Sequence, residues 1–86
     1  MIAAVRYRRR PVEMDVVGPL TASNIAGVAE WCSGRIAGVD GKVGLVIDTL
    51  EGPLCASPGD FIVRGVLGEH WAVKPDAFHA TYEVAS

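Results

Sequence analysis

The chain has 86 residues, of which 50% are hydrophobic, and it carries eight basic and ten acidic side chains. A chain of this length builds one domain around one core, and because such small domains are marginal alone we expect a dimer. Two cysteines are too few for the disulfide framework of a small secreted domain. No run approaches the roughly 18 apolar residues that cross a membrane, so we expect a cytoplasmic protein with no membrane partner.

The basic residues are concentrated at the N-terminus. Four of the first ten residues are arginines, Arg6, Arg8, Arg9 and Arg10, whereas the rest of the chain holds four basic and ten acidic residues. Guanidinium groups fit phosphate and Tyr7 could stack on a base, which makes residues 6–10 a candidate nucleic-acid contact. The alternative is that residues 1–11 form a basic arm or edge strand lying against the acidic remainder of its own domain or of a neighbouring subunit. Nucleic-acid-binding domains usually carry a basic balance throughout, which favours this alternative.

The elements up to residue 33 are predicted from periodicity. Residues 12–17 alternate apolar and acidic side chains, as a half-buried strand does. Within residues 24–33 the apolar side chains recur at helical spacing, so we expect a helix that docks on a sheet. The residues of its apolar face are Ile25, Val28, Ala29 and Cys32.

Residues 35–56 are predicted to be strands separated by turns. The pair Asp40-Gly41 suits the positive backbone angles of a tight turn, so segments 35–39 and 42–50 form a predicted hairpin. A second turn leads to a short strand at 54–56.

The last third of the chain continues as β-structure. We expect a turn at residues 57–60 in which the Asp60 carboxylate accepts hydrogen bonds from backbone amides two residues on. A strand at 61–64 and a strand at 69–73 then flank a turn. Residues 74–78 read as a single helical turn, followed by a final strand at 80–84.

Together these elements predict an α+β domain. One helix packs on a strongly bent antiparallel sheet of about five or six strands, and a small open barrel is one form that such a sheet could take.

Three segments of the chain resemble a known family. They are Tyr7-Arg8-Arg9-Arg10-Pro11-Val12, Pro58-Gly59-Asp60-Phe61-Ile62-Val63, and the stretch from Lys74-Pro75-Asp76 through Phe78 to Thr81-Tyr82-Glu83. The chain is similar to small proteins of tailed bacteriophages and prophages that have a YR(K/R)(K/R)PV arm, a PGD-aromatic-IV segment and a KPDxFxxTYE tail. Members often carry cysteine where this chain has Val73. The resemblance implies a phage-encoded protein in the host cytoplasm, from a family with no established biochemical activity.

The sequence favours binding over catalysis. It has no His-x-x-x-His, Cys-x-x-Cys or paired carboxylates at motif spacing, so we expect a non-enzymatic protein without metal or cofactor. We expect His70 to be an exposed strand residue. Binding of a host protein predicts an apolar or aromatic patch, for which Trp71 is the candidate if it is exposed. The alternative, which residue type favours, is that Trp71 packs in the core. Binding of a small nucleotide predicts instead a pocket lined by arginines such as Arg6, Arg8 or Arg64.

Overall fold

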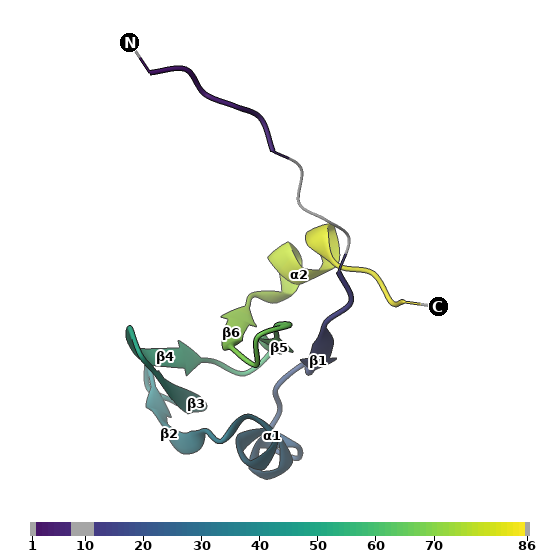
Figure 1. Ribbon diagram of the computed structural model, residues 1–86. Coiled ribbons are helices and arrows are strands. Elements are labelled where there is room, and N and C mark those ends of the chain that lie inside the picture. Colours follow the sequence, from purple (N-terminus) through teal and green to yellow (C-terminus); the bar gives the residue numbers. More distant parts are fainter. Residues whose placement is uncertain (1, 8–11, 86) are drawn as a thin grey trace.

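The computed structural model describes residues 2–7 and 12–85. Within these residues the fold is α+β, with two helices and six antiparallel strands in two sheets (Figure 1). One sheet has the order β1-β5-β6 and consists of β1 (Asp15–Val17), β5 (Phe61–Arg64) and β6 (His70–Val73). The other has the order β2-β3-β4 and consists of β2 (Arg35–Val39), β3 (Lys42–Thr49) and β4 (Gly52–Ala56). The helices are α1 (Ile25–Cys32) and α2 (Pro75–Thr81).

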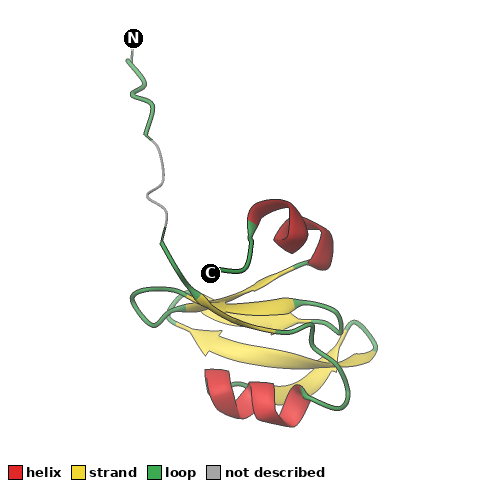
Figure 2. Ribbon diagram, turned by 90° about the vertical axis from the view of Figure 1, so that its right-hand side faces the viewer, coloured by secondary structure: helices red, strands yellow, loops and turns green. Residues whose placement is uncertain are grey.

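Helix α1 docks on the core as predicted. Its four buried residues are those of the predicted apolar face, Ile25, Val28, Ala29 and Cys32. They pack against Leu20, against Leu45, Ile47 and Ala56 of the second sheet, and against Ile62 of the first. Both sheets therefore contribute to one core beneath this helix. Figure 2 shows α1 on one side of the strands and α2 on the other.

The predicted hairpin is confirmed. Strands β2 and β3 pair in antiparallel register, and the turn residues Asp40 and Gly41 have φ angles of 49° and 77°. Strand β3 then pairs with β4 on its other edge.

The turn that ends at Asp60 is joined to the segment that begins at Lys74. Asp60 is 2% exposed, and its Oδ2 accepts hydrogen bonds from the Ser57 N–H and from Lys74 Nζ, each at 3.0 Å. The predicted turn is present, but the prediction that Asp60 bonds amides two residues on was wrong. The amide that it binds lies three residues earlier in the chain, and the second partner is a distant lysine.

Two details of the predicted fold were also wrong. The strands form two three-stranded sheets and no closed barrel among the described residues, instead of one bent sheet. There is a second helix, because α2 extends to Thr81 where the sequence predicted a strand at 80–84. The aromatic side chains explain this, since Phe78 stacks on Phe61 at 4.0 Å between ring centroids and Tyr82 stacks on Phe78 at 4.9 Å.

The N-terminal residues form no edge strand where the structure describes them. Residues 2–7 have neither helical nor strand structure, and in Figures 1 and 2 they project away from the folded body. We call them the 2–7 segment. Arg8, Arg9, Arg10 and Pro11 lie outside the described residues.

Candidate functional site

A largely apolar groove lies beside Trp71, one of the predicted site residues. It has a volume of about 250 Å³ and is lined by Val12, Met14, Gly65, Val66, Glu69 and Trp71. We call it the Trp71 groove. Val12 and Met14 come from the chain leading into β1, the next three residues from the turn between β5 and β6, and Trp71 from β6. Three pieces of chain thus converge on one half-buried tryptophan.

The pairing of β5 with β6 decides which side chains face this groove. Val63 lies opposite Trp71, and Arg64 lies opposite His70. Because neighbouring residues of a strand point to opposite faces, Trp71 and Arg64 lie on different faces of the sheet. The two predicted site residues therefore belong to two different surfaces.

The turn between β5 and β6 places the Glu69 carboxylate at the edge of the Trp71 groove. Glu69 folds over the turn, where its Oε1 accepts a hydrogen bond from the Leu67 N–H at 3.2 Å. Gly65 makes this possible, because a Cβ there would collide with the Glu69 carboxylate and come within 2.9 Å of Trp71 Cζ3. The groove is consequently apolar with one acidic side chain at its edge.

The apolar character of this surface extends beyond the groove. Val66 is 70% exposed and the neighbouring Leu67 86%, and Val12 on the opposite wall is also exposed. Exposed apolar side chains gathered around a tryptophan are typical of surfaces that bind another protein.

On the opposite face, Arg64 is held between Trp31 and His70. Its guanidinium carbon lies 4.0 Å from the centroid of the Trp31 ring, and one terminal nitrogen donates to the Trp31 carbonyl at 2.9 Å. Its Nε donates to His70 Nε2 at 3.2 Å. The stacking and the two hydrogen bonds fix this arginine as a bridge between α1 and β6.

His70 is half-buried, so the prediction of an exposed strand residue was wrong. Burial lowers the pKa of its imidazole below the ordinary value of 6.5, the charge of Arg64 lowers it further, and Glu69 acts in the opposite direction. Because Nε2 accepts the hydrogen bond from Arg64, the neutral imidazole carries its proton on Nδ1.

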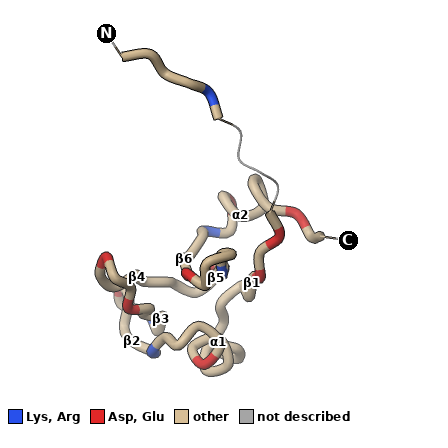
Figure 3. Tube along the Cα trace, viewed as in Figure 1, with Lys and Arg blue, Asp and Glu red and all other residues tan. Residues whose placement is uncertain are grey.

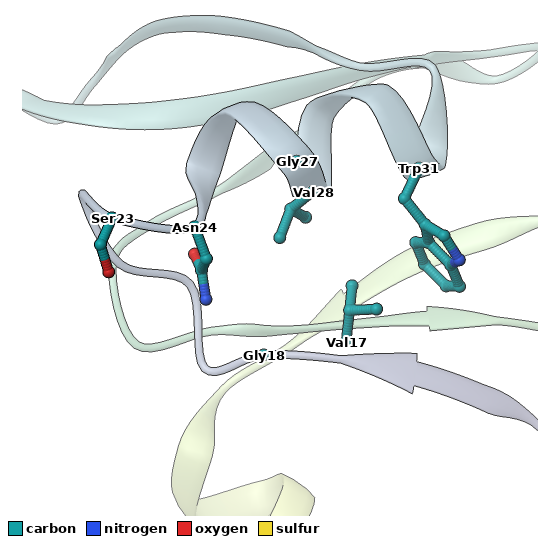
Figure 4. Close-up of a pocket in the computed structure, with 7 residues that line it drawn as sticks. All are labelled: Val17, Gly18, Ser23, Asn24, Gly27, Val28 and Trp31. Atoms are coloured by element: carbon teal, nitrogen blue, oxygen red, sulfur yellow. The ribbon is translucent and has the colours of Figure 1, made fainter.

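A second, more open hollow lies between α1 and the chain that leaves β1 (Figure 4). It has a volume of about 430 Å³ and is lined by Val17, Gly18, Ser23, Asn24, Gly27, Val28 and Trp31. The Asn24 amide is already used, since Oδ1 accepts from the Thr21 N–H at 2.7 Å and Nδ2 donates to the Pro19 carbonyl at 2.8 Å. Among the described residues, no arginine lines either of these two hollows.

Of the other predicted site residues, Arg6 and Tyr7 line neither of these hollows. Arg6 and Tyr7 belong to the exposed 2–7 segment, where Tyr7 is 88% exposed, and Arg8, Arg9 and Arg10 lie outside the described residues.

Sequence reasoning missed the walls of the groove. The alternation within residues 12–17 put Val12 and Met14 on one apolar face, but it held no signal that this face lies beside Trp71. Alternation also put Glu69 on the same side as Trp71, whereas Val66 lies in the turn and only the fold places it at the groove.

No group of three His, Cys, Asp or Glu side chains lies close enough to hold a metal ion within residues 2–7 and 12–85. None of the helices in this part of the chain has the length and apolar character to span a bilayer.

Comparison with known proteins identifies no relative. We compared the chain with models of protein families, with curated protein sequences and with solved structures, and none of them matches.

Proposed function

We propose that this protein is a phage- or prophage-encoded accessory protein that works in the host cytoplasm without catalysis, by binding a segment of a host protein in the Trp71 groove. The observation that carries the proposal is the exposed apolar surface around Trp71, with Glu69 at its rim. The phage setting is supported by the sequence resemblance carried by the segments around Tyr7, Asp60 and Lys74.

The size and chemistry of the groove favour a protein segment over a small molecule. At about 250 Å³ it is smaller than pockets that enclose a drug-sized ligand, which begin at about 300 Å³. An open apolar groove can instead accept one or two side chains of a longer chain that continues along the surface. The Glu69 carboxylate favours a segment with a basic residue next to its apolar ones.

The test is selection of displayed random peptides on the purified protein. We expect enrichment of peptides in which apolar and basic residues adjoin, and loss of their binding by a Val66→Asp variant, because an added carboxylate makes the apolar surface costly to desolvate. Val84→Asp is the matched control, since Val84 is exposed and does not line the groove. Peptides that bind both variants as well as the wild type, or no enrichment at all, would refute this use of the groove.

A second candidate is binding of nucleic acid through the 2–7 segment and the arginines that follow it. It is favoured by the exposure of Arg6 and Tyr7, which leaves a cation and an aromatic ring open to phosphate and base. The test is a salt titration of oligonucleotide binding. Phosphate contacts predict a steep loss of affinity with salt, and the absence of binding at about 50 mM salt would remove this candidate.

A further inference from the structure

We propose that in the free protein the Trp71 groove of one copy holds the 2–7 segment of a second copy, so that two chains form a dimer by exchanging these segments. A host segment would then have to displace a segment of the partner chain. This inference rests on the proposed function in one respect, namely that the groove binds an apolar stretch of chain.

The 2–7 segment has apolar side chains that its own domain does not cover. Val5 is 71% exposed and Tyr7 88%, and Ile2 is also exposed. In an extended chain Val5 and Tyr7 point to the same side, whereas Arg6 points to the other. The segment thus offers two neighbouring apolar anchors on one side and a cation on the other.

The charges of the segment and the groove are complementary. Arg6 lies between the two anchors in the sequence, while Glu69 lines the groove. Glu13 and Asp15 add negative charge to the chain entering β1, although alternation turns them away from the groove face of Val12 and Met14. Figure 3 shows this separation, with a basic residue on the projecting segment and acidic residues along the chain that leads into β1. Opposite charges at the rim of an apolar contact favour one register over others.

The geometry indicates that the 2–7 segment binds in the groove of a second copy and not in the groove of its own chain. Val12 and Met14 form a wall of the groove, and the 2–7 segment belongs to the same stretch of chain and points away from the body in both views (Figures 1 and 2). A neighbouring chain can receive it in this direction. In a two-fold dimer each chain gives one segment and receives one, so that the same contact forms twice and the assembly closes.

The experiment uses two full-length variants with exposed substitutions, which leave the core intact. One is the double variant Val5→Ser, Tyr7→Ser, which lacks the anchors, and the other is Val66→Asp, which has an impaired groove. Sedimentation equilibrium should show a wild-type dimer and a dimer dissociation constant raised at least about 10-fold in either variant, because each loses both contacts. Ile2→Ser, on the other side of the segment, and Val84→Asp should dimerise like the wild type.

Mixing the two variants gives the decisive result. One of them retains the groove and the other retains the segment, so a heterodimer has one intact contact and should form more tightly than either variant alone. A monomeric wild type, unweakened dimers of the variants, or variants that fail to complement each other would each overturn the exchange. If the wild type is monomeric while selected peptides still bind the groove, the proposed function stands and this inference alone fails.

Discussion

Asp60 is the buried carboxylate that connects two distant parts of the chain. It accepts one hydrogen bond from the Ser57 backbone and one from Lys74, whose side chain is largely exposed. The lysine is largely exposed and regains water when its partner is lost, whereas the half-buried Ser57 amide loses the acceptor that closes the turn. Removal of Asp60 therefore destabilises the protein mainly through the loss of the hydrogen bond that closes the turn at residues 57–60.

We predict that Asp60→Ala lowers the free energy of unfolding by about 2 kcal/mol, because the half-buried Ser57 N–H and the Lys74 ammonium both lose their acceptor. Asp76→Ala is the control, since that exposed carboxylate in the first turn of α2 should contribute less than about 1 kcal/mol. Urea denaturation measures both. Equal losses in the two variants would show that the Asp60 contacts do not stabilise the turn.

His70 makes the stability depend on pH. Its pKa is lowered in the folded protein, first by burial and then by Arg64, so the unfolded chain takes up the proton first as the pH falls below about 6.5. The neutral imidazole therefore adds fully to the folding stability above that pH. This stabilisation is lost as the pH falls through the lowered pKa of His70 in the folded protein. Protonation also removes the acceptor for Arg64 Nε.

We therefore predict that stability falls more steeply between pH 7 and pH 5 in the wild type than in His70→Gln, whose amide oxygen can still accept from Arg64. The measurement is the free energy of unfolding of each protein against pH. Parallel curves would show that His70 does not titrate differently in the folded state.

At the scale of elements, strand β3 has no room at Gly44. A Cβ at this position would lie 2.5 Å from the Ala56 carbonyl oxygen and 2.8 Å from Val39 Cγ2. The neighbouring strands β2 and β4 therefore close over this residue. In contrast, a Cβ added to Gly38 of β2 would have no atom within 4 Å.

Gly44→Ala should lower the free energy of unfolding by about 1–3 kcal/mol, because the sheet must shift to accept the methyl group. Gly38→Ala should change it by no more than about 0.5 kcal/mol. Thermal denaturation of the two variants provides the comparison, and a Gly44→Ala protein as stable as Gly38→Ala would contradict the tight packing of β3.

Helix α2 depends on its aromatic contacts. It has no fully buried residue and is held by the stack that joins Phe61, Phe78 and Tyr82. Phe78→Ala should lower the stability by about 2 kcal/mol, less than for a fully buried phenylalanine. Leu67→Ala, at an exposed position, is the control, and urea denaturation is the measurement. A Phe78→Ala loss no larger than that of Leu67→Ala would refute the role of the stack.

Local signals in the sequence predicted the elements that depend on them. The Asp40-Gly41 pair predicted the β2–β3 hairpin, and the spacing of Ile25, Val28 and Cys32 predicted the buried face of α1. The split into two sheets and the length of α2 depend on distant contacts, such as that of Phe78 with Phe61, which no local pattern contains. Trp71 was selected from its residue type alone, whereas its groove required the register that sets it opposite Val63.

At the scale of the whole molecule, the projecting 2–7 segment and the Trp71 groove are two surfaces that one chain leaves uncovered. Exchange between two chains would cover both, which suits a domain whose small core is marginal alone. In such a dimer the groove is occupied by the 2–7 segment of the partner chain, so a host segment would have to displace that segment in order to bind. The acidic body and the basic N-terminus favour the same assembly.

The most direct test of this account is the fluorescence of Trp71 in a full-length Trp31→Phe variant, which has Trp71 as its single tryptophan and keeps a ring beneath Arg64. We predict that adding Val5→Ser and Tyr7→Ser to this variant moves the emission to longer wavelength, because Trp71 loses its cover, and that a synthetic peptide of residues 1–11 restores it. Identical emission with and without the two anchors, unchanged by the peptide, would show that no chain segment lies in the groove.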